Sequence, residues 1–187
     1  MSNGETPQPG WLPRRWLTVV SCDLDLRAGV GAIWLVSLPG STRAINHTAL
    51  IERCGQQWRW IGGGSGAADL PTERSAAGSP GQIGMMEIGG ESGVVSLVYR
   101  LRHPHLDSAP WVQSSELRVA TEVDHLLLGE RRIEVPAHGA LIVVWKSPSN
   151  HATRPLIVAL NHEGSQLSKI GPHDRVDSFT WTRLNNQ

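Results

Sequence analysis

The chain has 187 residues, of which 40% are hydrophobic, and this is enough to fill the core of one domain of ordinary size but not of two. Its 17 basic and 17 acidic side chains cancel, so the composition argues against nucleic acid or another polyanion as a partner. No uninterrupted apolar stretch approaches the roughly 18 residues of a membrane-spanning helix.

The N-terminal residues 1–10 are polar and contain two prolines, and they predict a disordered tail without the charged start and apolar core of a signal peptide. We therefore expect a cytoplasmic location, with a signal removed before residue 1 as the alternative. The two cysteines, Cys22 and Cys54, fit a reducing compartment, and the sequence leaves open whether they pair.

Strand signals dominate the rest of the chain. Apolar and polar residues alternate over 24–30 and 117–123, which is typical of half-buried strands. Further short β-branched or aromatic runs predict strands at Trp16–Val20, Ala32–Leu38, Thr48–Arg53, Trp58–Ile61, Val94–Leu101, Arg132–Val135, Ala140–Trp145, Leu156–Leu160 and Ser178–Arg183.

Glycine, proline and asparagine turn signals separate these runs at short intervals, and no window has the three- and four-residue apolar spacing of a convincing helix. The pattern predicts an all-β fold: a mostly antiparallel two-sheet β-sandwich with little or no helix, forming a single domain over 11–184. Residues 62–81 are rich in Gly, Ser, Ala and Pro without periodicity, so they predict a long mobile surface loop that proteases cut first near Arg74.

Tryptophan is the unusual residue, with eight copies against one tyrosine and one phenylalanine. Trp58 and Trp60 are two apart, so in a strand both project from one face and Arg59 from the other. This pair is the candidate ligand-binding site, as a flat platform for a sugar ring, a peptide or a partner's side chains. The alternative is that both indoles belong to the core.

The segment His103-Pro104-His105-Leu106-Asp107 resembles the HxHxD core of metallo-β-lactamase-like hydrolases. The resemblance implies that His103, His105 and Asp107 hold zinc and activate a water molecule. Ser108 stands where that family has a further histidine, and the alternating helices and strands of the family are missing. The structural interpretation is a polar loop opened by Pro104.

No residue set supplies a nucleophile, a base and an orienting group together, so we assign no catalytic residues and no cofactor. The leading hypothesis is a non-enzymatic binding or interaction module for a protein, a small molecule or a sugar of unknown identity. The alternatives are a zinc-dependent hydrolase that uses the HPHLD segment and a carbohydrate-binding β-sandwich.

Overall fold

A computed structural model describes residues 17–68, 73–103, 105–148 and 153–186 of the chain. The predicted all-β class is confirmed, because strands make up 52% of the structure and helices 7%, and the sheets are antiparallel. The tail predicted over 1–10 lies outside the described residues.

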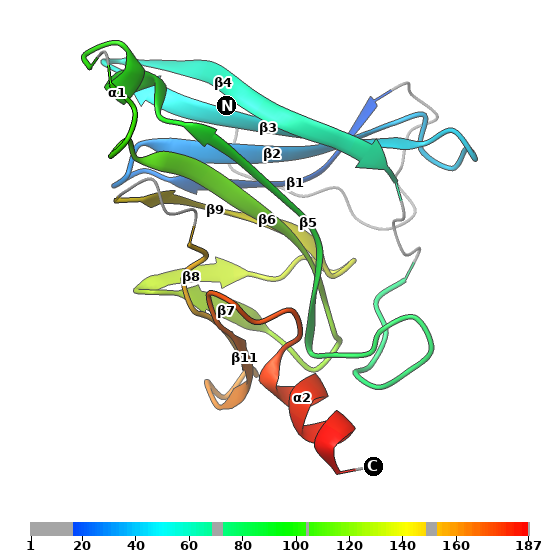
Figure 1. Ribbon diagram of the computed structural model, residues 1–187. Helices are drawn as coiled ribbons and strands as arrows, with labels where there is room; N and C mark the ends of the chain where they lie inside the picture. The colour runs from blue at the N-terminus through cyan, green and yellow to red at the C-terminus, as the bar shows by residue number, and fades with distance from the viewer. Residues whose placement is uncertain (1–16, 69–72, 104, 149–152, 187) are drawn as a thin grey trace. The chain divides into compact units, whose positions relative to one another are not determined.

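Eleven strands and two short helices follow one another along the described chain (Figure 1). In chain order they are β1 Leu17–Asp25, β2 Val30–Ser37, β3 Ile45–Cys54, β4 Gln57–Ala67, β5 Met86–Val95, α1 Leu97–Arg100, β6 Trp111–Val119, β7 His125–Leu128, β8 Arg131–Glu134, β9 Ala140–Ser147, β10 Ile157–Leu160, β11 Gln166–Ile170 and α2 Ser178–Asn185.

The strands form three sheets, where the sequence predicts two. Their strand orders are β1-β2-β3-β4, β11-β10-β7-β8 and β5-β6-β9. The chain also divides into two compact units, each made of three separate segments. The first contains Met1–Asp69, Gly90–Glu116 and Ile142–Ala152, and the second Leu70–Gly89, Leu117–Leu141 and Thr153–Gln187. A single domain over 11–184 arranged as a sandwich stays a prediction.

The β1-β2-β3-β4 sheet belongs to the first unit and is a meander of three hairpins. The alternation over 24–30 is not one strand, because β1 ends at Asp25 and the chain turns before Val30. The Asp25 carboxylate accepts a hydrogen bond from the Ala28 N–H at 2.8 Å, and Gly29 has a φ of +67°. An Asx-type turn closed by a left-handed glycine therefore overrides the local alternation.

The structure corrects the mobile loop predicted over 62–81 at its start, because β4 continues through the glycines to Ala67. A bulge at Ile61 shifts the register, so that Leu50 pairs with Gly62 while Ile51 pairs with Trp60. A Cβ on Gly63 would lie 1.8 Å from the Thr48 carbonyl oxygen. Glycine is required here for close backbone approach to β3, which composition alone does not distinguish from loop flexibility.

Arg74, within the predicted loop, lies in the second unit. The Arg74 guanidinium donates to the carbonyls of Val119 at 3.0 Å, of Ala120 at 2.6 Å and of Val123. Burial lowers its pKa. These hydrogen bonds tie Arg74 to the end of β6 and the residues after it, and first cleavage near Arg74 stays a prediction.

Two helices replace predicted strand segments. Ser96 caps α1 within the apolar run 94–101, and Asp177 caps α2, which includes the predicted strand 178–183. The Asp177 carboxylate also accepts hydrogen bonds from the Met86 N–H and the Ser168 hydroxyl, both at 3.0 Å. The Asp177 cap is held by remote parts of its own unit and stabilises a helix here, although aromatic and β-branched residues favour a strand.

Candidate interaction surface

The pairing register sorts the residues of the β1-β2-β3-β4 sheet onto two faces. On the inner face, Val30, Ala32 and Leu50 are fully buried. Parts of β5, β6 and β9 from the same unit contact this face. For example, the Thr48 hydroxyl donates to Glu116, and the Ile142 N–H donates to the Ser21 hydroxyl at 3.2 Å. The inner face is therefore the core of the first unit.

The opposite side of the sheet is here called the outer face. It consists of Leu17, Val19, Cys22 and Leu24 from β1, Gly31, Ile33, Leu35 and Ser37 from β2, Ile45, His47, Ala49, Ile51 and Arg53 from β3, and Trp58, Trp60, Gly63, Ser65 and Ala67 from β4. Antiparallel sheets with one face in solvent normally alternate apolar with polar residues. Here large apolar side chains lie on both sides of the sheet, so the outer face is more apolar than this alternation predicts.

Large apolar side chains of the outer face are accessible to solvent. Trp60 is 71% exposed, Leu17 is 53% exposed, and Val19, Leu24 and Ile45 are each above 40%. Trp58 is half-buried. Because large exposed apolar patches on soluble proteins are often interaction sites, the outer face is a candidate interaction surface.

The centre of the outer face is shaped by Gly31. A Cβ at this position would lie 2.5 Å from a methyl group of Leu24 and 2.9 Å from the side chain of Ile51. The side chains of β1 and β3 therefore lean over β2 and make the apolar surface continuous across three strands.

The carboxylates of β1 to β4 are all on the inner side of the sheet. Asp23, Asp25 and Glu52 pair in register with the inner-face residues Ala32 and Val30. The Asp23 carboxylate accepts a hydrogen bond from the Val144 N–H at 2.8 Å. Asp23 thereby gives a partner to a backbone N–H group of β9, which is an edge strand of its sheet. The outer face carries a cation, Arg53, and no carboxylate.

Glu52 is only 1% exposed and forms an ion pair with the Lys146 ammonium at 2.7 Å. It also accepts hydrogen bonds from the Ser96 hydroxyl at 2.6 Å and the Val98 N–H at 3.2 Å. Burial acts to raise the pKa of Glu52, but these donors outweigh it and lower the pKa below its ordinary value. Since Ser96 is fully buried, the cluster joins β3, α1 and β9 and offers no accessible nucleophile.

The second unit contains a histidine and carboxylate pair at the start of β7. His125 is 4% exposed, and its Nδ1 lies 2.9 Å from the Asp124 carboxylate, which also accepts a hydrogen bond from Arg132 at 3.2 Å. The His125 hydrogen bond is the main cause that lowers the pKa of Asp124, with Arg132 adding to it. This arrangement holds the β7–β8 hairpin together at its ends.

The predicted metal ligands lie in the loop after α1. His103, His105 and Asp107 are all exposed, and Pro104 lies outside the described residues. The His103 ring stacks on Tyr99 with centroids 4.3 Å apart, and the Tyr99 hydroxyl lies 3.1 Å from the Ser108 hydroxyl. Within the described ranges, no group of three or more His, Cys, Asp or Glu side chains is placed to hold a metal ion.

Both cysteines are free thiols. Cys22 is exposed on the outer face, where partial burial and the neighbouring Asp23 raise its pKa. Cys54 ends β3 and is half-buried.

Comparisons with known proteins give no relative: no family model, no curated protein and no solved structure matches the chain. Among the described helices, none is long and apolar enough to cross a membrane. The strongest candidate site is therefore the outer face. Sequence reasoning found its tryptophan pair but missed the rest, although the run Val30–Ser37, which is apolar at both odd and even positions, is the available signal.

Proposed function

We propose that the protein is a non-enzymatic interaction module that binds an apolar surface of a partner through the outer face. The observation that carries the proposal is the row of large apolar side chains that the outer face exposes, whereas the described residues of the unit pack against the inner face. Burying large exposed side chains such as Trp60 and Leu17 is the main driving force available to it.

A carbohydrate-binding module is the second candidate, because Trp58 and Trp60 project from one face and Trp60 is 71% exposed. Sugar recognition combines an aromatic platform with polar groups that bind hydroxyls. The neighbours of Trp60 on this face are mostly apolar: they include Trp58, Ile51, Ala49 and Gly63, and Arg53 is the polar one. The surroundings therefore favour an apolar partner over a sugar.

A zinc-dependent hydrolase is the weakest candidate, because His103, His105 and Asp107 are exposed and form no ligand group with other described residues. The two free thiols support a reducing compartment such as the cytoplasm.

The test compares two exposed tryptophans. We expect wild-type protein to be retained on a phenyl matrix and to bind a hydrophobic dye, and Trp60→Ser to weaken both. Trp181→Ser is the matched control, since Trp181 is 62% exposed on α2 in the second unit. Both variants should keep their free energy of unfolding within about 1 kcal/mol of wild type, because neither indole is core. Equal losses of retention in the two variants would refute the proposal.

Sugar binding is separated by a thermal-shift screen with simple oligosaccharides. A shift that disappears in both Trp58→Ala and Trp60→Ala, without a loss of retention on the phenyl matrix, would favour the carbohydrate module over the apolar partner.

A further inference from the structure

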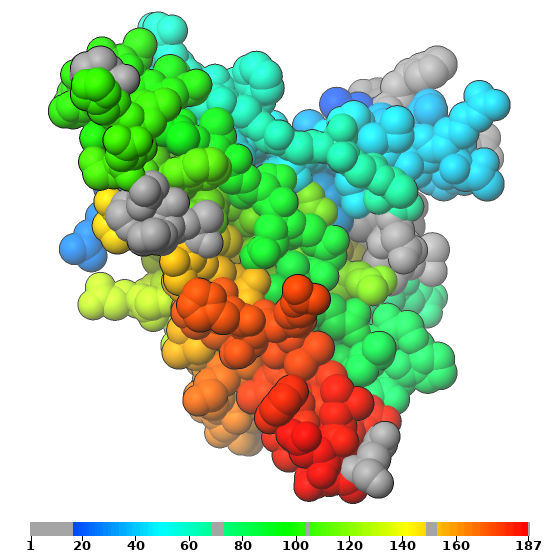
Figure 2. Space-filling model, viewed as in Figure 1, coloured from blue at the N-terminus to red at the C-terminus, as the bar shows by residue number. Residues whose placement is uncertain are grey.

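One end of the first unit gathers three connections that are far apart in the sequence. The β1–β2 turn over 26–29 and the β3–β4 turn over 55–56 lie at the same end of the sheet, and the Arg53 N–H donates to the Gly29 carbonyl at 2.8 Å. Helix α1 packs beside them, since the Val98 N–H donates to Glu52. Figure 2 shows α1 and the residues that follow it, in green, at the surface at the upper left of the view.

Exposed apolar side chains occupy these connections, where turns normally carry polar residues. Leu26 is 64% exposed in the β1–β2 turn, and Trp60 is 71% exposed beyond the β3–β4 turn. After α1, Leu101 is 71% and Leu106 is 43% exposed. Leu26, Leu101 and Leu106 thus present apolar side chains to solvent from two of these connections, and Trp60 does so from β4 beside the third.

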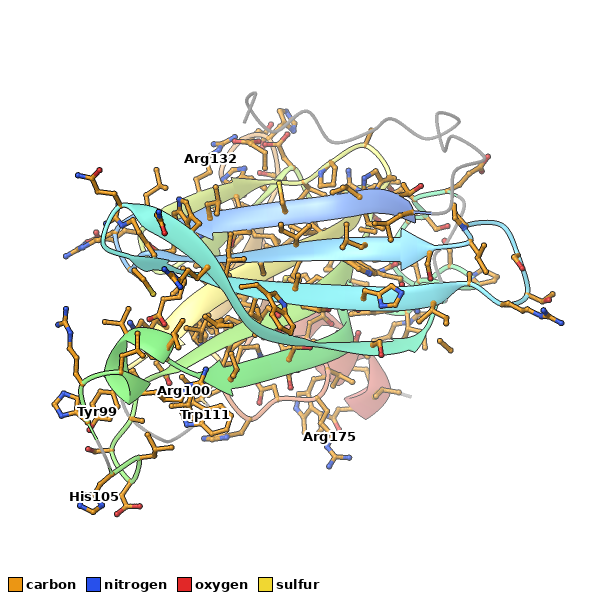
Figure 3. The ribbon with its side chains drawn as sticks, turned by 90° about the horizontal axis from the view of Figure 1, so that it is seen from above. Tyr99, Arg100, His105, Trp111, Arg132 and Arg175 are labelled. Atoms are coloured by element: carbon orange, nitrogen blue, oxygen red, sulfur yellow. The ribbon has the colours of Figure 1, made fainter. Side chains whose placement is uncertain are left out.

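Four arginines lie on these connections or on the elements that flank them. Arg53 and Arg59 flank the β3–β4 turn, and Arg100 and Arg102 belong to α1 and the residues after it; all four are exposed. Figure 3 shows Arg100, Tyr99, His105 and Trp111 at this end of the unit. We name the set Leu26, Arg53, Arg59, Trp60, Arg100, Leu101, Arg102 and Leu106 the basic apolar end.

Few carboxylates oppose these arginines among the described residues. Glu52 is buried against Lys146, and Asp25 is half-buried and accepts the Ala28 N–H. Asp107 is the exposed carboxylate of the loop. Although the whole chain is neutral, the basic apolar end therefore combines a local excess of positive charge with apolar side chains.

We propose that the basic apolar end docks on the surface of a bilayer that contains anionic lipids. The inference rests on the proposed function and names its partner, because Trp60 belongs to both surfaces. Leucine side chains on turns and a tryptophan on the neighbouring strand enter the boundary between headgroups and acyl chains, and nearby arginines bind lipid phosphates. The contact is peripheral and needs no spanning segment.

The charge distribution favours this partner over two others. A second copy of the chain would bring arginines against arginines at this end, which costs binding free energy. Nucleic acid would satisfy the arginines, but it would leave Leu26, Leu101 and Leu106 without an apolar environment.

The experiment is co-sedimentation of the full chain with vesicles of phosphatidylcholine alone and of phosphatidylcholine mixed with phosphatidylglycerol. We expect binding to the mixed vesicles only, weakened by salt. Since each basic residue near an anionic surface contributes about five-fold in affinity, Arg100→Gln with Arg102→Gln should weaken binding by roughly 25-fold. Arg43→Gln is the control, because Arg43 is exposed in the β2–β3 turn at the opposite end of the sheet, and it should leave binding unchanged.

Leu101→Ser with Leu106→Ser tests the apolar contribution and should also weaken binding to mixed vesicles by at least ten-fold. Absence of vesicle binding, equal binding to neutral vesicles, or an equal effect of Arg43→Gln would overturn the membrane proposal. Tight binding of a DNA duplex in place of vesicles would do the same. If the protein were still retained on the phenyl matrix through Trp60 in that case, the proposed function would hold and its partner would be something other than a membrane.

Discussion

At the scale of single residues, β6 carries a polar sequence in a buried position. Ser114 and Ser115 are 1% and 0% exposed, yet their hydroxyls differ. The Ser115 hydroxyl donates to Glu91 at 3.0 Å, whereas the Ser114 hydroxyl has no hydrogen-bond partner among the described residues. A buried hydroxyl without a partner costs free energy, and a satisfied one does not.

This contrast predicts opposite effects of the same substitution. Ser114→Ala should leave the free energy of unfolding unchanged or raise it by about 1 kcal/mol, because it removes a desolvated group. Ser115→Ala should lower it by about 1 kcal/mol, because it removes a made hydrogen bond and leaves a Glu91 oxygen without this donor. Urea denaturation of both variants measures the difference, and equal destabilisation would show that Ser114 has a partner in solution.

Glu52 predicts a pH dependence of stability. Its folded pKa is below the ordinary 4.5, so its stabilising effect is complete above that pH and is lost as the pH falls through the folded value. At pH 6, Glu52→Gln should lower the free energy of unfolding by about 3 kcal/mol, since it leaves Lys146 without its counter-charge.

The difference between wild type and Glu52→Gln should shrink as the pH falls below 4.5, as measured by urea denaturation across the acid range. Glu163→Gln is the matched control, because Glu163 is exposed and its substitution should change stability by less than about 0.5 kcal/mol. A constant difference across the acid range would contradict the role of the Glu52 charge.

At the scale of elements, β4 shows how a glycine-rich segment forms a regular strand. Gly63 and Gly66 lie three apart on it, but they meet different surroundings. A Cβ on Gly63 would contact the Thr48 carbonyl oxygen at 1.8 Å, whereas a Cβ on Gly66 would meet nothing within 4 Å. The glycines are therefore not interchangeable, although they lie in one low-complexity run.

Gly63→Ala should separate β3 from β4 and lower the free energy of unfolding by about 3 kcal/mol or more. Gly66→Ala should change it by less than about 1 kcal/mol, in the stabilising direction, because alanine restricts the unfolded chain. Thermal denaturation compares the two variants. Similar melting temperatures for both would mean that β4 is not paired with β3 at Gly63.

Local periodicity predicted what depends on one strand alone. The all-β class and the projection of Trp58 and Trp60 from one face follow from it. The apolar continuity of Cys22, Ile33, Ala49 and Gly63 depends on which strands pair and in which register, and no local pattern contains that information. Helix α2 was missed for the same reason, because Asp177 is held by Met86 and Ser168 from elsewhere in its unit.

At the scale of the whole molecule, neither compact unit is a continuous stretch of chain, because the division falls within β5, β6 and β9. The first unit needs residues after 90 to cover a sheet whose strands end at Ala67. The Thr48 hydroxyl bond to Glu116 and the Glu52 ion pair with Lys146 are two of these links. Independent folding of a simple N-terminal piece is therefore not expected.

A fragment of residues 17–68 contains all four strands of the β1-β2-β3-β4 sheet, but it lacks the parts of β5, β6 and β9 that contact the inner face. We expect it to bind hydrophobic dye strongly and to show no cooperative unfolding by circular dichroism, whereas the full chain unfolds cooperatively. A cooperative transition in the fragment would show that the sheet is stable without its inner-face partners.

The order of these strands has a consequence for biosynthesis. A ribosome releases β1 to β4 before Glu116 and Lys146 exist, so the nascent hairpins have uncovered apolar side chains on both sides and no counter-charge for Glu52. At roughly 5–20 residues per second, this interval lasts on the order of several seconds. We therefore expect the yield of folded protein to depend on what happens during this interval more than on the stability of the finished molecule. Two factors would raise the yield: protection of the emerging chain by a chaperone, and a slow start to its compaction.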